Sequence, residues 1–219
     1  MTFSVVARCK RTGQVGVGVA TARHLDVRLA AYTRSRVGAV VTQGAVNPYF
    51  GYDGLRDLSR GRPADEAMRK LLSKDSDPDA RQLAVVDGRG GVAAWTGERV
   101  PGWAADLQGA SFSTQGSRVR GSGVLEAMGE VMRSTEGEYM VERLLQALEA
   151  GGAEGGDVSG ERAAHLRVME REEYALWDLR VDDADEPLRE LRRLYDLFEG
   201  SVLPQVREMP KRAEFLPAL

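Results

Sequence analysis

The start of the chain constrains the fold most, because two neighbouring segments there alternate with a period of two. Residues 2–8 read Thr-Phe-Ser-Val-Val-Ala-Arg and residues 14–21 read Gln-Val-Gly-Val-Gly-Val-Ala-Thr. Such alternation places successive side chains on opposite faces of a β-strand. The polar segment between them ends in glycine and suits a hairpin turn. The second strand has a face of only Gly16, Gly18 and Ala20, so another backbone or a ligand can approach it closely.

Later segments continue as blocks of strands separated by helices. We expect a loop over 44–52, and residues 23–36 follow neither period. Blocks of antiparallel strands between helix pairs favour an α+β fold over a doubly wound sheet, in which strand and helix would alternate one for one. The further strands are expected at 37–43, 82–86, 92–96, 110–115, 163–169 and 174–180, and helices at 53–60, from Pro63, from Ser122, up to Gly151 and from Pro187.

Length and charge narrow the class of protein. With 219 residues the chain has room for one domain, which we place at 1–200 with a C-terminal tail at 201–219. The net charge of −3 argues against a nucleic-acid partner, which needs a basic surface. No apolar run approaches the roughly 20 residues of a membrane helix. The first ten residues lack a basic stretch followed by an apolar one, so we expect a cytoplasmic protein without a secretory signal.

Motifs for metals and cofactors are weak. Cys9 is the single cysteine, which excludes an internal disulfide and a thiolate zinc site. Residues 121–126, Gly-Ser-Gly-Val-Leu-Glu, imitate a dinucleotide fingerprint but carry Glu at the third glycine position and lack a surrounding βαβ unit. The acidic segment 182–186 lacks the glycine and distant Glu of a calcium loop. We therefore expect no cofactor and no metal.

One feature indicates chemistry. Thr2 follows Met1, and a small second residue permits removal of the methionine. Removal would leave a threonine whose α-amine has a pKa of about 7.7–8.0. Such an amine can take the proton from its own hydroxyl, so that one residue is nucleophile and base. The plain alternative is that the chain begins Met-Thr for no catalytic reason, as many proteins do.

Taken together, the motifs of residues 2–198 resemble the domain of unknown function 1028 family. The matching segments include residues 2–8, the strand 37–43 followed by Asn47, Gln115-Gly116, the Gly-Gly-Asp of 155–157, and the Asp-Leu-Arg-Val-Asp-Asp of 178–183. No single segment is specific; their order and spacing are. The resemblance implies an αββα four-layer sandwich of two mainly antiparallel sheets, grouped with the N-terminal nucleophile (Ntn) hydrolases.

By analogy with that superfamily, the resemblance implies an amidohydrolase acting on a small amide or peptide-like substrate, with Thr2 attacking a carbonyl. Fold analogy by itself is weak support for an activity. Residues expected beside Thr2, because strand alternation puts them on its face or at neighbouring strand ends, are Ser4, Thr21, Thr42, Gln43 and Asn47. Ser4 and Thr42 have a structural alternative between the sheets, and Asn47 has one in the turn before Pro48.

The chain also departs from the family's usual residues. Ala22 stands where relatives have a lysine after the second strand, Ser117 where they have Asn, and Ala184 where they have His. The loss of polar groups around one cleft favours an alternative function, a non-catalytic member that binds a small ligand or a protein partner. A metal hydrolase is the third and weakest hypothesis. Aromatic residues near strand edges are compatible with a homodimer.

Overall fold

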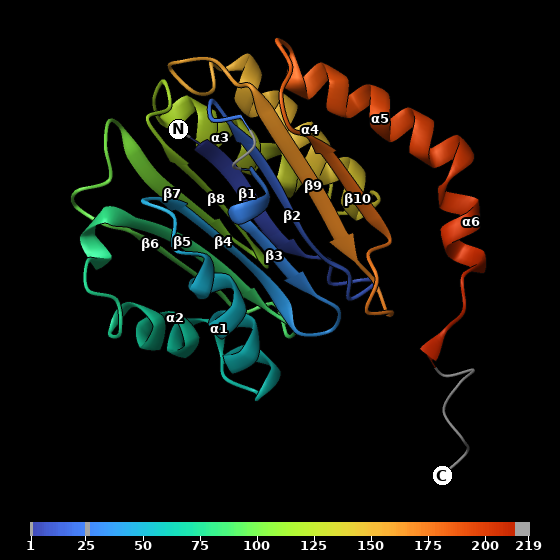
Figure 1. The fold of residues 1–219 in the computed structure, drawn as a ribbon, viewed down its shortest axis with the longest axis horizontal. Coiled ribbons are helices and arrows are strands. Elements are labelled where there is room, and N and C mark those ends of the chain that lie inside the picture. The colour runs from blue at the N-terminus through green and yellow to red at the C-terminus, as the bar shows by residue number, and fades with distance from the viewer. Residues whose placement is uncertain (1, 25–26, 213–219) are drawn as a thin grey trace.

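A computed structural model describes residues 2–24 and 27–212 of the chain as two stacked antiparallel sheets with helices on both outer faces (Figure 1). The larger sheet has six strands in the order β10-β9-β2-β1-β8-β7, and the smaller has four in the order β3-β4-β5-β6. The expected α+β class and αββα sandwich are confirmed.

The strand bounds place β1 at the centre of the larger sheet. It pairs antiparallel with β2 on one side and with β8 on the other. The strands are β1 (Thr2–Arg8), β2 (Val15–Thr21), β3 (Ala31–Arg34), β4 (Gly38–Gly44), β5 (Arg81–Asp87), β6 (Val92–Thr96), β7 (Ala104–Gly109), β8 (Phe112–Ser117), β9 (Ala163–Met169) and β10 (Trp177–Val181).

Each helix pair covers one sheet. Helices α3 (Ser122–Ser134) and α4 (Met140–Ala153) pack on the larger sheet, and α5 (Pro187–Ser201) packs over β9 and β10 and leads into α6 (Leu203–Glu208). Helices α1 (Pro48–Ser59) and α2 (Ala64–Leu72) cover the smaller sheet. Two short 3-10 turns, η1 (Val27–Leu29) and η2 (Pro78–Ala80), complete the elements.

Alternation along β1 divides its side chains between two layers. Phe3 and Val5 join the apolar core under α3 and α4, whereas Val6 joins the core between the sheets. Thr2 and Ser4 share the face of Val6 because strand side chains repeat with a period of two. They therefore point toward the smaller sheet.

The small-residue face of β2 receives helix α4. A Cβ built on Gly16 would lie 2.6 Å from Cδ1 of Leu144, and one built on Gly18 would lie 3.1 Å from Cδ1 of Leu148. Real Cβ atoms do not approach other atoms as closely as the first distance. The glycines thus bring the helix close to the sheet, and the approaching group predicted for this face is a helix rather than a ligand.

Three elements differ from the sequence-based expectations. The expected loop over 44–52 is wrong from residue 48, since α1 begins at Pro48 with Asn47 as its N-cap. Strands β3 and β7 were missed. Only three of the six residues of β7 are apolar, all with part of their surface exposed, and β3 is four residues long.

Candidate functional site

Three hydroxyl side chains lie side by side at the end of the larger sheet. Thr2 pairs with Thr21 of β2 and with Ser117 of β8, and directly opposed residues in a ladder share a face. Oγ1 of Thr2 donates a hydrogen bond to Oγ1 of Thr21 at 3.1 Å. We call Thr21, Thr2 and Ser117 the hydroxyl row. It belongs to the end of β1 at which the chain enters the sheet (Figure 1).

The two neighbours of Thr2 differ in their hydrogen bonds. Thr21 also accepts a hydrogen bond from the backbone amide of Arg23 at 3.2 Å. Oγ of Ser117 is fully buried and, among the residues that the structure describes, has no hydrogen-bond partner. A buried hydroxyl without a partner is costly unless something else uses it. Ser117 thus offers a donor beside the Thr2 hydroxyl.

Below the hydroxyl row, Ser4 connects the two sheets. Its hydroxyl donates to Oε1 of Gln43 in β4 at 2.6 Å and accepts from Nε2 of Gln115 in β8 at 2.6 Å. Nε2 of Gln43 in turn donates to the backbone carbonyl of Thr2 at 3.2 Å. Ser4, Gln43 and Gln115 are all essentially inaccessible to solvent. This contact fixes the backbone of Thr2 against the smaller sheet.

The network continues through Gln82 of β5. Nε2 of Gln43 donates to Oε1 of Gln82 at 2.6 Å, and Nε2 of Gln82 lies within 3.0 Å of Oγ1 of Thr96 and the carbonyls of Ala105 and Gly116. Thr96 then donates to a carboxylate oxygen of Asp106 at 2.9 Å. The donors therefore all point in one direction, from Gln115 through Ser4 toward Asp106. We call this chain the inter-sheet network.

Thr42 and Asn47 do not join this network. Thr42 accepts a hydrogen bond from the backbone amide of Asn47, whose side chain caps α1 by accepting from the amide of Tyr49. Nδ2 of Asn47 donates to Asp75 at 2.7 Å. Burial alone would raise the pKa of Asp75, but hydrogen bonds from the Asp77 amide, Asn47 and Arg81 hold it below its usual value. Asn47 is thus committed to the turn before Pro48.

Of the residues predicted beside Thr2, the structure brings Ser4, Thr21 and Gln43 into hydrogen-bonded contact with it or with one another. Ser117, Gln82 and Gln115 were absent from that prediction. Ser117 could have been found, since it follows Gln115-Gly116 where the family has a polar amide. Nothing in the local sequence singles out Gln82, because its role arises from contacts with strands far along the chain.

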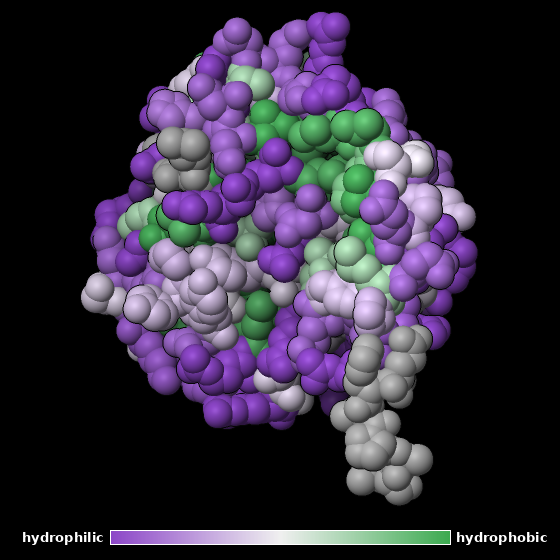
Figure 2. All heavy atoms as spheres, turned by 45° about the vertical axis from the view of Figure 1, so that its right-hand side comes forward, coloured by the Kyte–Doolittle hydropathy of each residue, from purple (hydrophilic) through white to green (hydrophobic). Residues whose placement is uncertain are grey.

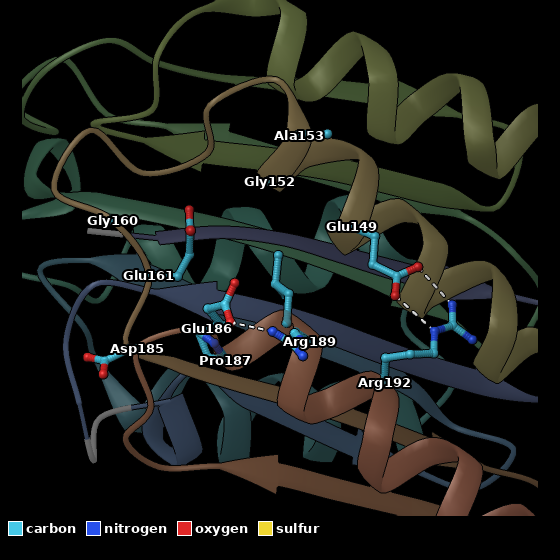
Figure 3. Close-up of a pocket in the computed structure, with 11 residues that line it drawn as sticks. Glu149, Gly152, Ala153, Gly160, Glu161, Asp185, Glu186, Pro187, Arg189 and Arg192 are labelled. Atoms are coloured by element: carbon cyan, nitrogen blue, oxygen red, sulfur yellow. Dashed lines mark hydrogen bonds and ion pairs between the residues drawn. The ribbon is translucent and has the colours of Figure 1, made fainter.

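A cavity of about 510 Å³ lies between the end of α4 and the start of α5, on the other side of the larger sheet (Figure 3). Arg192 spans it with hydrogen bonds to both carboxylate oxygens of Glu149. Glu186 and Arg189 form a second ion pair at its edge. Thr2 is not among the lining residues. The Arg192–Glu149 pair joins α5 to α4, whereas the Glu186–Arg189 pair lies at the start of α5.

The family is decided by comparison of the whole sequence. The sequence profile of a family of unknown function, DUF1028, matches residues 2–191. The chain belongs to the DUF1028 family. The crystal structure of protein SPO2555 from Silicibacter pomeroyi, also assigned to DUF1028, superposes with a TM-score of 0.88 at 27% sequence identity, covering 97% of this chain and 96% of that one.

Two other solved structures are more distant. Anbu (ancestral beta-subunit) from Yersinia bercovieri has a TM-score of 0.42 at 12% identity, over 99% of both chains. The Anbu (Gly-1) mutant from Hyphomicrobium sp. strain MC1 has a TM-score of 0.44 at 12% identity, over 97% of this chain and 99% of that one. No functionally curated protein matches this DUF1028 chain. Within residues 2–24 and 27–212, no helix has the length and apolar character to cross a membrane.

Proposed function

We propose that this DUF1028 protein is an amidohydrolase that acts on a small amide or peptide-like substrate, with Thr2 as an N-terminal nucleophile. The observation that carries the proposal is the hydroxyl row. Thr2 stands at the start of a central strand, half-buried, between Thr21 and the partner-free hydroxyl of Ser117 in the described part of the chain. Met1 lies outside the described residues, and its removal is part of the proposal.

The proposed reaction follows from the groups beside Thr2. Once Met1 is removed, the neutral α-amine of Thr2 takes the proton from Oγ1, and Oγ1 attacks the carbonyl carbon of the amide. The carbonyl oxygen becomes an oxyanion, for which Ser117 is a hydrogen-bond donor. The proton then passes to the leaving nitrogen as the C–N bond breaks. Water hydrolyses the remaining ester and regenerates Thr2.

The inter-sheet network supports a positioning role for Gln43 rather than a direct one. Both ends of its amide are engaged, with Ser4, Gln82 and the carbonyl of Thr2. An engaged amide is not free to stabilise an oxyanion, but it holds the nucleophile's backbone in place. Reacting groups must be held within a fraction of an ångström of their working geometry, so this contact matters for rate.

A second function, binding without catalysis, is favoured because the amide NH2 groups of Gln43 and Gln115 already donate to protein groups. These amides hydrogen-bond to protein groups, and Ala22 and Ala184 offer no side-chain donor. On this hypothesis Thr2 only stabilises the end of β1, and replacing it with alanine would leave binding of the ligand or protein partner intact.

The experiment has two measurements on the purified protein. Intact mass spectrometry shows whether Met1 is removed. Incubation with a β-lactone, an electrophile that acylates activated hydroxyls, then tests for a covalent adduct, located by peptide mapping. We expect processed chains to gain one adduct at Thr2, Thr2→Ser to retain it, and Thr2→Ala to lose it. Turnover in an amide and peptide library, lost in Thr2→Ala, would complete the test.

The two functions give different results. If the purified protein retains Met1, or if the lactone reacts equally with wild type and Thr2→Ala, the nucleophile hypothesis is wrong. Binding of a ligand that survives Thr2→Ala, without any adduct in wild type, would support the non-catalytic alternative.

A further inference from the structure

The end of the sandwich opposite Thr2 contains a cavity of about 940 Å³. Three hairpin turns meet there, those between β1 and β2, between β3 and β4, and between β9 and β10 (Figure 1). Val206 and Arg207 of helix α6 line the cavity as well. The run of β1 from Thr2 to Arg8 puts about 20 Å between this end and the hydroxyl row. We call this space the turn-end cavity.

Cationic side chains dominate its lining. The chain as a whole carries a net charge of −3, so a concentration of positive charge in one cavity is a local feature and not a property of the whole surface. Figure 2 brings this side of the molecule forward and shows mostly hydrophilic residues around smaller apolar patches. The charged residues that line the cavity are Arg11, Arg36, Arg171, Arg207 and Lys211, with two carboxylates, Glu170 and Glu172.

The two carboxylates have other partners. Oε1 of Glu170 accepts a hydrogen bond from Nε2 of Gln14 at 2.9 Å, and Oε2 of Glu172 accepts one from the backbone amide of Arg212 at 3.0 Å. Neither forms an ion pair with an arginine of the cavity among the residues described. Both carboxylates keep their charge, but the five cationic side chains of the lining outnumber them, so the cavity remains positive.

Three of the arginines are free to bind. In the described structure, the side chains of Arg36, Arg171 and Arg207 form neither a hydrogen bond nor an ion pair. The three residues come from separate segments of the chain and line the same cavity. A guanidinium presents a planar fork of donors that matches a carboxylate or phosphate group. Three such groups around one cavity match a ligand with more than one negative charge.

Arg36 supports this independently. It has φ of 61°, in the left-handed region where glycine or asparagine would be less strained. The turn that holds it is fixed by a hydrogen bond from the Ser35 hydroxyl to the carbonyl of Glu170 at 2.7 Å. The turn itself does not require an arginine at this strained position. The arginine places a positive charge at the cavity despite the backbone strain.

We propose that the turn-end cavity binds a small organic polyanion through Arg36, Arg171 and Arg207. The shared chemistry is a pair of phosphate or carboxylate groups on a compact body, and Leu176 and Val206 supply apolar surface for that body. Lys211, which donates to the hydroxyl of Tyr174 at 3.1 Å, adds positive charge nearby. This site is separate from the Thr2 site and does not depend on the proposed amidohydrolase activity.

Isothermal titration calorimetry of the full chain tests the proposal with two probes, inorganic pyrophosphate and citrate, in buffer of physiological salt concentration. We expect saturable one-to-one binding of at least one probe, and the preferred probe distinguishes a phosphate ligand from a carboxylate ligand. The variants are Arg36→Asn, which tolerates the left-handed backbone, Arg171→Gln and Arg207→Gln. Each removes charge-assisted hydrogen bonds and should weaken binding about tenfold or more.

Arg120→Gln is the matched control, because Arg120 is exposed, lies toward the opposite end of the sandwich and also lacks a side-chain partner among the described residues. It should bind as wild type does. Circular dichroism and thermal unfolding check that each variant folds. Because Arg207 is exposed on α6, its substitution disturbs the fold least. Dissociation constants weaker than about 1 mM for both probes, or equal weakening in the control, would overturn the proposal.

Discussion

Ser117 lies directly opposite Thr2 in the ladder between β1 and β8, and its buried hydroxyl has no hydrogen-bond partner among residues 2–24 and 27–212. The opposite neighbour, Thr21, hydrogen-bonds to Thr2 at 3.1 Å. One flanking hydroxyl is thus engaged and the other is available. This asymmetry assigns different roles to two residues that the ladder places symmetrically around the proposed nucleophile.

Replacing Ser117 with alanine should slow acylation of Thr2 by a β-lactone about a hundredfold, because it removes a donor for the developing oxyanion. Ser117→Asn supplies a different donor at the same position and should recover part of the rate. The measurement is the rate of adduct formation by intact mass spectrometry.

Ser113→Ala is the matched control for that comparison. Ser113 lies four residues earlier on the same face of β8, opposite Val6, and its hydroxyl is also buried without a partner in the described structure. Its loss should leave the acylation rate unchanged. Equal rates for Ser117→Ala and wild type would mean that Ser117 takes no part in the reaction.

Gln82 should contribute strongly to stability. Gln82→Leu removes its four hydrogen-bonded contacts, with Nε2 of Gln43, the hydroxyl of Thr96 and the carbonyls of Ala105 and Gly116. Gln43 keeps its bond to the Thr2 carbonyl, and Thr96 keeps its bond to Asp106. A hydrogen bond inside a protein contributes about 0.5–1.5 kcal/mol, so we expect the loss of these contacts to lower the free energy of unfolding by about 3 kcal/mol. Urea unfolding measures it. Gln108→Leu, at an exposed position of β7, should change it little; similar losses in both would contradict a special role for the network.

Local periodicity predicted most of the fold, because strands with one buried face and helices with an apolar stripe give periodic hydrophobic patterns in the sequence. The pattern failed where a segment buries little. Strand β7 exposes some surface at every residue, and β3 is short. The sequence predicts a loop over 44–52 that holds Asn47 and Pro48, yet Asn47 caps a helix there, and the ring of Tyr32 packs against Gly51.

The site was less predictable than the fold. Thr2, Ser4 and Thr21 follow from alternation within one hairpin, so their common face could be derived locally. Gln43, predicted as a residue at a neighbouring strand end, joins them by hydrogen bonds across the two sheets. Gln82 and Gln115 join the inter-sheet network only because strands far apart along the chain pack together, and a local sequence pattern does not predict such packing.

Gly16 should be intolerant of any side chain. A Cβ there would lie 2.6 Å from Leu144 and 3.1 Å from the carbonyl of Arg167, so Gly16→Ala must displace α4 or β9. Overpacking of this kind costs about 1–3 kcal/mol. Gly200→Ala in α5 provides the opposite case, since nothing lies within 4 Å of its added Cβ and alanine favours a helix by about 1 kcal/mol. Thermal unfolding should show a lower midpoint for the first variant and an equal or higher one for the second.

The last prediction concerns pH and the contact between α1 and α2. Asp57 is buried in α1, where it accepts hydrogen bonds from Nζ of Lys70 at 2.6 Å and Nε of Arg62 at 3.3 Å. Burial by itself would raise the pKa of Asp57, but the hydrogen bond and charge of Lys70, with those of Arg62, outweigh it and hold the pKa below its usual value. The folded state therefore favours the ionised carboxylate.

The sign of the pH dependence follows from that lowered pKa. A carboxyl with a lower pKa in the folded state stabilises the protein at pH values above its unfolded pKa of about 3.9, and the stabilisation is lost as the pH falls through the folded value. Asp57→Asn should lower the free energy of unfolding by about 2 kcal/mol at pH 7, where wild type has two charge-assisted hydrogen bonds. The difference between wild type and variant should shrink below pH 4. Asp65→Asn, which removes an exposed ion pair with Arg69, should have little effect at either pH. A gap between wild type and Asp57→Asn that stays constant from pH 7 to acid would show that shape, and not charge, is what Asp57 contributes.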